Sequence, residues 1–215
     1  MRQMIDMDDF EIVTVAAAHT ILGPLVAATL LADGFQEVGL LKWVRSADQP
    51  VRQVLCFLQG KGGVLAPSWG VSLDFVPHVS GSTVKWHRTA KSAMLDLRLD
   101  PYDRALEMSY YHGIKPIAAR APQVVPLAIA QARQFWSRCQ RTDDLLDAVQ
   151  WLKQYYAPAG GLGFYNFVQH PLALAFVYAR AGRTADAMAE LDQYVLASDD
   201  TIKEDLRRRI LSAGM

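Results

Sequence analysis

The sequence predicts an α+β domain, in which helices pack around a small antiparallel sheet. An uncharged, Ala-rich segment with helical periodicity comes first, and short runs with twofold alternation follow it. Beyond Pro101 the helical period returns and continues to the C-terminus. We therefore expect an N-terminal helix, an antiparallel sheet of about five strands in a meander, and C-terminal helical hairpins.

The first helix is predicted to run from Asp8 to Asp33. Asp8 or Asp9 can cap its N-terminus, and Gly34 follows at the position where helices often end. Pro24 is expected to kink this helix or to begin a second one. The predicted buried stripe consists of Ile21, Leu25, Ala28 and Ala32, widened by Leu22, Val26 and Leu30.

Residues 12–32 contain no Asp, Glu, Lys or Arg, and the run is long enough to cross a bilayer. The run includes His19 and a central Gly23-Pro24, and acidic residues flank it without a basic cluster to orient it. These features favour a buried core helix. No basic segment with a cleavage site precedes it, so we expect a cytoplasmic protein rather than a secreted or membrane protein.

The sheet is predicted from runs of alternating residues that are separated by turn formers. The expected strands are 35–45, 53–59, 69–76, 83–87 and 93–99. Residues 46–50, 60–63 and 77–81 are rich in Gly, Pro, Ser and Asp, and are expected to form the turns. Short strands joined by tight turns are typical of an antiparallel meander.

The second half is predicted to consist of helices at 124–139, 142–156, 171–181, 184–197 and 201–212. Thr142-Asp143 and Thr184 are the expected N-caps, and Gly182 is expected to end a helix. Residues 174–187 resemble one tetratricopeptide hairpin, but no second copy follows at a fixed period. The expected organisation is a helix plus sheet over 1–104 and a helical region over 105–215 packed on it, together forming one structural domain.

The charge balance argues against a nucleic-acid partner. The chain has 22 Lys plus Arg and 22 Asp plus Glu, for a formal net charge of zero. Its dense basic run, Arg207 to Arg209, lies at a predicted helix end, where the helix dipole favours cations. The two cysteines, Cys56 and Cys139, are too few for a disulfide framework and are expected to be buried thiols.

The candidate site is the polar face of three predicted strands, in which apolar and polar residues alternate. If the strands pair in order, this face gathers Ser72, Asp74, Lys85, His87, Asp96 and Arg98, with His78, Arg88 and Thr89 at the strand ends. A carboxylate beside a histidine is the minimum for acid–base chemistry. Asp74, His78 and His87 can also supply oxygen and nitrogen ligands to a metal, although their spacing matches no ligand signature.

The competing interpretation is that these side chains only solvate an outer sheet face. The candidate residues are Asp74, His78, Lys85, His87, Arg88 and Asp96; no catalytic residue, metal ligand or cofactor is assigned. The glycines at 60–63 lack the spacing of a phosphate-binding loop. The sequence also has no Gly-x-Ser-x-Gly elbow and no metalloprotease or paired CxxC signature.

Three short segments carry a resemblance. Leu31 to Phe35, Trp43 to Arg45 and Ser68 to Val71 are similar to segments of an uncharacterised bacterial family of domains of unknown function. The resemblance covers about residues 10 to 100. It implies a helix, a strand meander and C-terminal helices, and it implies a binding role, because some members lie near polymorphic-toxin genes and are suspected immunity proteins.

The sequence alone does not determine the function. We predict a non-enzymatic cytoplasmic protein-binding module, of the immunity-protein kind that the resemblance implies. The alternative is a small hydrolase or metal-dependent enzyme that uses the polar sheet face. A third hypothesis is a homo-oligomer held by the C-terminal helices. The expected partner is another protein, not nucleic acid or membrane, and the oligomeric state stays open.

Overall fold

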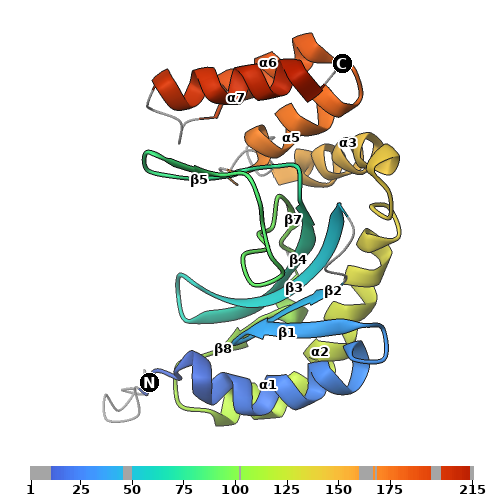
Figure 1. Ribbon diagram of the computed structural model, residues 1–215. Coiled ribbons are helices and arrows are strands. Elements are labelled where there is room, and N and C mark those ends of the chain that lie inside the picture. The colour runs from blue at the N-terminus through green and yellow to red at the C-terminus, as the bar shows by residue number, and fades with distance from the viewer. Residues whose placement is uncertain are drawn as a thin grey trace. The chain divides into compact units, whose positions relative to one another are not determined.

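The computed structural model describes residues 11–45, 50–101, 103–159, 167, 169–194 and 200–213. The predicted α+β class is confirmed: an N-terminal helix, an antiparallel sheet and C-terminal helices follow one another along the chain (Figure 1). The α-helices are α1 (Val15–Leu30), α2 (Lys115–Trp136), α3 (Leu145–Tyr156), α5 (Gln169–Arg180), α6 (Thr184–Asp192) and α7 (Asp200–Ala213). The 3-10 turns are η2 (Arg104–Leu106), η3 (Thr142–Asp144) and η4 (Ala157–Ala159).

The strands are β1 (Phe35–Gly39), β2 (Lys42–Arg45), β3 (Val51–Gly60), β4 (Val64–Leu73), β5 (His78–Ser80), β6 (Thr83–Lys85), β7 (Leu97–Leu99) and β8 (Met108–Ser109). The main sheet has the order β1-β2-β3-β4-β7, and β8 also pairs with β4. The strands β5 and β6 form a separate two-stranded sheet.

Thr14 is the N-cap of helix α1, and its side chain accepts a hydrogen bond from the Ala17 amide at 3.1 Å. The predicted caps, Asp8 and Asp9, lie outside the described residues. The buried stripe is Ala18, Leu22, Val26 and Leu30, whereas Ala28 is exposed. The predicted stripe was therefore centred one position away from the true one. Pro24 lies inside this helix and does not begin a second one.

In the described part of the chain, no helix has both the length and the apolar character needed to cross a membrane. Helix α1 instead buries one side, with residues four apart pointing the same way. Burial accounts for the apolar residues on that side, whereas the exposed positions Thr20, Pro24 and Ala28 are uncharged as well.

The segment predicted as one strand at 35–45 is a hairpin. Strands β1 and β2 pair with Phe35 opposite Arg45, and the chain turns at Leu40-Leu41. Leu41 has a φ of 59°, in the left-handed region that usually falls to Gly or Asn. Leu41 is also buried, so packing of its side chain accompanies the strained backbone. Because neither Leu40 nor Leu41 is a typical turn residue, the pattern predicted one continuous strand.

The predicted meander is wrong for the run at 83–87. Its strand β6 does not enter the main sheet but pairs with β5, with His78 opposite Lys85. Strand β5 itself lies within 77–81, which was predicted to be a turn. Strand β4 pairs directly with β7, placing Gly70 opposite Arg98.

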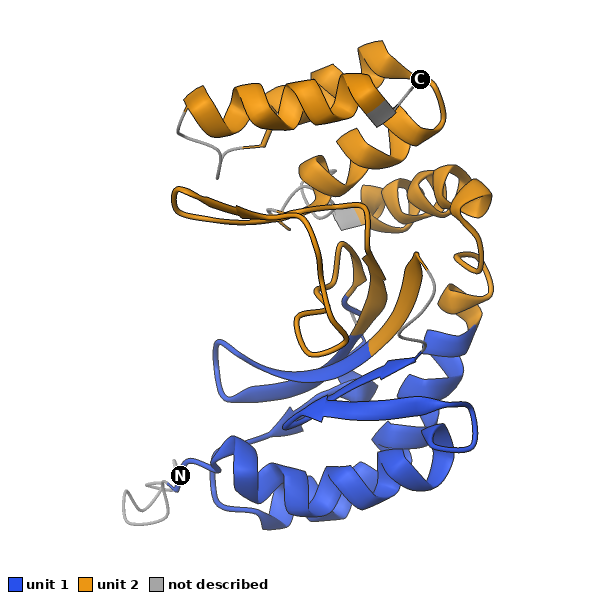
Figure 2. Ribbon diagram, in the orientation of Figure 1, with its two compact units in different colours: residues 1–45, 55–68, 100–133 blue, residues 46–54, 69–99, 134–215 orange. Residues whose placement is uncertain are grey.

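Contacts divide the chain into two compact units (Figure 2). Unit 1 comprises residues 1–45, 55–68 and 100–133, and unit 2 comprises residues 46–54, 69–99 and 134–215. In unit 1, Gln59 donates to the Val13 carbonyl at 3.2 Å, and Arg133 pairs with Asp33 at 2.6 Å. Strands β3 and β4 contribute residues to both units.

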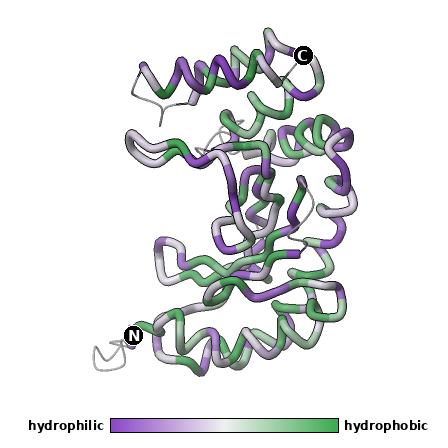
Figure 3. The backbone as a smooth tube through the Cα atoms, in the orientation of Figure 1, coloured by the Kyte–Doolittle hydropathy of each residue, from purple (hydrophilic) through white to green (hydrophobic). Residues whose placement is uncertain are grey.

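Unit 2 contains the C-terminal helices, of which α5 is the central one. Every side chain from His170 to Ala179 is buried, and α5 packs against α6 and α7. Two of these helices differ in hydropathy (Figure 3): α5 is largely apolar, whereas α7 alternates between hydrophilic and apolar residues. Apolar surface all around α5 is typical of a helix that is covered on all sides.

Helix ends in this region show which local predictions succeed. Gly182, with a φ of 72°, ends α5 as predicted: its amide bonds to Ala179 and the Arg183 amide bonds to Tyr178, the pattern of a Schellman motif. The predicted cap Thr184 is instead the first residue of α6. The predicted cap at Thr142-Asp143 is part of η3.

We predict that Gly70→Ala destabilises the protein by at least ~1–3 kcal/mol, the cost of overpacking a tight site. A Cβ at Gly70 would overlap the carbonyl oxygen of Leu97 on β7. The matched control is Gly39→Ala on β1, where a Cβ meets nothing within 4 Å, and its effect should be about 0.5 kcal/mol or less. Urea unfolding measures both, and equal stabilities would contradict the close approach of β4 and β7.

Both cysteines are buried reduced thiols, as predicted. Burial, with a contribution from Asp144, raises the pKa of Cys139 to about 12. Because the thiolate is the reactive form and a raised pKa depletes it, Cys139 should resist thiol reagents at pH 8. We expect negligible labelling of the folded protein by a chromogenic disulfide and rapid labelling of both cysteines in denaturant. Fast reaction of the folded protein would contradict this burial.

Candidate functional site

The candidate site residues do not form one polar sheet face. Because β6 pairs with β5 and not with the main sheet, the structure separates them into three places. His78 and Lys85 are opposite each other on the β5–β6 hairpin. Arg88 and Asp96 form a buried ion pair, and Asp74 and His87 line a pocket.

The Arg88–Asp96 pair is almost completely hidden from solvent, with side chains 1% and 0% exposed. The Arg88 guanidinium donates to an Asp96 oxygen at 2.5 Å and to the Pro77 carbonyl at 2.8 Å. The same Asp96 oxygen accepts from the Leu73 amide at 2.7 Å, and its other oxygen accepts from Gln169 at 3.3 Å. Burial raises the pKa of Asp96, and the neighbouring Arg88 opposes this shift.

The expectation of a solvated outer face is therefore wrong for part of the set. Asp96 and Arg88 are buried, and so is Ser72, whose hydroxyl accepts from the Met94 amide at 3.2 Å. Arg98 lies over the ring of Phe167 at 4.7 Å. Twofold alternation identifies two different faces of a strand but not which face other elements cover.

His170 is a buried histidine that the sequence did not single out. Its Nε2 accepts a hydrogen bond from the Arg98 amide at 2.9 Å, so this nitrogen carries no proton. The ring is fully buried and packs edge-on against Phe167 at 5.0 Å between centroids. This hydrogen bond links α5 to β7, so His170 has a structural role.

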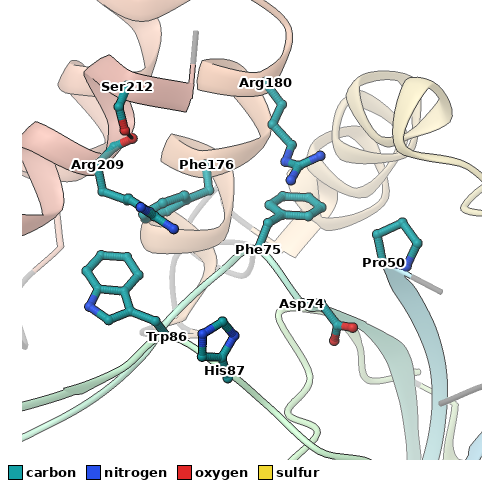
Figure 4. Close-up of a pocket in the computed structure, with 9 residues that line it drawn as sticks. All are labelled: Pro50, Asp74, Phe75, Trp86, His87, Phe176, Arg180, Arg209 and Ser212. Carbon is teal, nitrogen blue, oxygen red and sulfur yellow. Dashed lines mark hydrogen bonds between the residues drawn. The ribbon is translucent and has the colours of Figure 1, made fainter. Parts of the chain in front are cut away.

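The pocket is a cavity of about 480 Å³ in unit 2 (Figure 4). It is within the size range of small-molecule and peptide-anchor sites. Segments from the ends of β4 and β6 and from helices α5 and α7 line it. The lining residues are Pro50, Asp74, Phe75, Trp86, His87, Phe176, Arg180, Arg209 and Ser212.

Two arginines reach into this pocket from the helices (Figure 4). The Arg180 guanidinium lies 4.2 Å from the centroid of the Phe75 ring, and the Arg209 guanidinium lies 5.4 Å from that of Trp86. Trp86 in turn meets Phe176 edge-to-face, with centroids 6.3 Å apart. Each guanidinium is thus positioned by an aromatic ring.

Asp74, the acidic side chain among the described lining residues, is already neutralised. Asp74 forms an ion pair with Arg52 of β3, whose side chain is only 5% exposed. The Asp74 amide also donates to the Pro50 carbonyl at 3.0 Å. Among the described residues, neither Arg180 nor Arg209 has a carboxylate partner. The pocket therefore carries an excess of positive charge.

The hypothesis of a metal held by Asp74, His78 and His87 is not supported by this arrangement. His78 is absent from the pocket lining and faces Lys85 across the hairpin. Over the described ranges, no group of three His, Cys, Asp or Glu side chains lies close enough to hold a metal ion.

The sequence prediction missed Phe176, Arg180 and Arg209. They belong to helices α5 and α7, far along the chain. The alternation within strands, from which the candidate residues were chosen, does not involve these helices. Arg209 belongs to the basic run that was interpreted as a favourable helix end, and its guanidinium points into the pocket (Figure 4). Arg180 is the one Lys, Arg, Asp or Glu residue of α5, and this charge at the end of an apolar helix was the available signal.

Comparison with known proteins gives no relatives: no protein-family model, curated protein or solved structure matches this chain.

We predict that Asp96→Ala destabilises the protein by about 3–5 kcal/mol, because it leaves the buried Arg88 charge without a partner. Arg88→Ala should cost a similar amount. The double replacement Arg88→Met with Asp96→Leu should cost less than either single one, since it removes both buried charges. Urea unfolding of the three variants measures these differences, and additive losses would disprove the coupling.

Proposed function

We propose that this chain is a non-enzymatic, cytoplasmic binding module, and that the pocket of unit 2 receives part of another protein. The observation that carries the proposal is the pair of guanidinium groups, Arg180 and Arg209, that lie on aromatic rings around the pocket without a carboxylate partner among the described residues. Arginine and tryptophan are the residues that most often dominate the binding energy of protein interfaces.

The exposure of the lining favours a protein partner. His87, Arg180, Arg209 and Ser212 are exposed, although they border the cavity. Small-molecule sites usually bury most of the ligand surface. An open pocket with exposed arginines at its border is better suited to a side chain or segment that protrudes from a second protein.

The contacts of the polar residues also favour binding over catalysis. Arg52 holds Asp74 as an ion pair, so this carboxylate is already engaged within the fold. The Ser212 hydroxyl donates to the Arg209 carbonyl at 2.9 Å, and within the described structure no hydrogen bond joins it to His87. A nucleophile and base in contact, the usual sign of covalent catalysis, are thus not assembled.

The immunity-type role is consistent with this description. An immunity protein needs a complementary surface and no catalytic group. The resemblance of residues 10 to 100 to a family with suspected immunity members is the reason for naming this role, and it extends the proposal to a partner encoded by a neighbouring gene.

The first prediction of this proposal concerns the partner. The tagged wild-type chain, expressed in its native host, should co-purify with one protein in a stoichiometric complex, as measured by size-exclusion chromatography with light scattering. In the purified complex, Trp86→Ala should weaken binding by about 2 kcal/mol or more, because it removes an aromatic anchor of the pocket.

The control is Leu127→Ala on α2, which replaces an exposed apolar side chain that does not line the pocket. It should leave the affinity within about 0.5 kcal/mol of wild type. Both variants should melt near the wild-type temperature. Recovery of no stoichiometric protein, or of one that binds Trp86→Ala as tightly as wild type, would remove the support for this function.

The alternative is a small hydrolase or metal-dependent enzyme. One observation favours it: Asp74 and His87, both named from the sequence, line the same pocket. Activity on generic ester, amide and phosphate substrates that is lost in both Asp74→Asn and His87→Ala would establish the enzyme. Activity unchanged in these variants would come from a contaminant.

A further inference from the structure

We infer that the ligand of the unit 2 pocket is an acidic peptide segment, whose carboxylates bind Arg180 and Arg209 while an apolar side chain packs on the aromatic lining. This inference rests on the proposed function, and it adds the chemistry by which the partner is recognised.

Both arginines of the pocket lie against aromatic rings. A guanidinium is planar, and its five N–H donors point outward in that plane. The Phe75 ring lies near the Arg180 guanidinium at 4.2 Å, and the Trp86 ring lies near that of Arg209 at 5.4 Å. A cation–π contact leaves the guanidinium donors without a carboxylate partner, so a ligand carboxylate can accept hydrogen bonds from them. The rings also hold the two groups in place before a ligand arrives.

The charge around the pocket also favours an acidic ligand. The charges of Arg180 and Arg209 are not compensated among the described residues, because Asp74 already pairs with Arg52. The whole chain has a formal net charge of zero, so this excess is local to the pocket. A ligand with negative charge is therefore attracted, and a cationic one is repelled.

The apolar lining of the pocket favours a peptide over a small inorganic anion. Phe75, Trp86, Phe176 and Pro50 surround the same cavity as the two arginines (Figure 4). Inorganic phosphate would satisfy the arginines but would leave this apolar surface in water. A peptide that places an aromatic or aliphatic side chain between acidic ones covers both kinds of surface.

The test uses a synthetic pentapeptide, blocked at both ends, with glutamates on both sides of a central phenylalanine. Its counterpart carries glutamine in place of glutamate. Calorimetric titration of the full chain should show binding of the acidic peptide and at least 10-fold weaker binding of the glutamine peptide. Binding should weaken as salt is raised, because salt screens the charges.

Arg180→Ala and Arg209→Ala should each weaken binding of the acidic peptide roughly 10- to 100-fold, the loss expected for a charged hydrogen bond. Arg209→Lys should recover only part of the affinity, because an ammonium keeps the charge but not the planar fork. The matched control is Arg208→Ala, which removes the same charge from the same helix at an exposed position outside the pocket. It should stay within about 2-fold of wild type.

Three results would overturn the inference. Equal binding of the two peptides would exclude carboxylate recognition, and an equal loss in Arg208→Ala would reduce the effect to general charge. Arginine-dependent binding of adenosine monophosphate or inorganic phosphate without peptide binding would assign the pocket to a small phosphorylated ligand.

The two proposals fail separately. A recovered partner that is sensitive to Trp86→Ala but binds both arginine variants normally would preserve the proposed function and end this inference. Peptide binding that depends on both arginines, in the absence of any recoverable partner, would count against the proposed function alone.

Discussion

The carboxylate of Asp96 is the interaction on which the arrangement of unit 2 depends. It is fully buried, and it accepts from three segments that are far apart in sequence: the Leu73 amide at the end of β4, the Arg88 side chain after β6, and Gln169 at the start of α5. A buried charge is tolerated only when it is paired and hydrogen-bonded, so these partners cannot move away from it without a large cost.

The walls of the pocket follow directly from these bonds. Asp74 and Phe75 come immediately after Leu73, Trp86 and His87 come immediately before Arg88, and α5 carries Phe176 and Arg180 beyond Gln169. A single buried acid therefore fixes three of the segments that line the pocket. Only α7, which brings Arg209, is placed by packing on α5 and α6 instead. Arg180 therefore lies on a helix that Asp96 anchors, whereas Arg209 lies on a helix that only packing positions.

Such an arrangement is suited to recognition. The polar residues behind the lining hydrogen-bond to Asp96, whereas the charged groups at the pocket lie against aromatic rings without a carboxylate partner among the described residues. Preorganised groups lose less conformational entropy when a ligand binds. Preorganisation would serve catalysis as well, but Asp74, the acid among the described lining residues, is held by Arg52.

Local sequence determined the α+β class, strand β3 and the end of α5 at Gly182, because periodicity and a left-handed glycine act over a few neighbouring residues. Tertiary structure alone decided that Leu41 turns a hairpin, that β6 pairs with β5, and that Asp96 is buried. Alternation shows that a strand has two faces, but which partner covers them depends on segments such as α5, which come much later in the chain. The pocket, assembled from helices and strand ends, exists only after that packing.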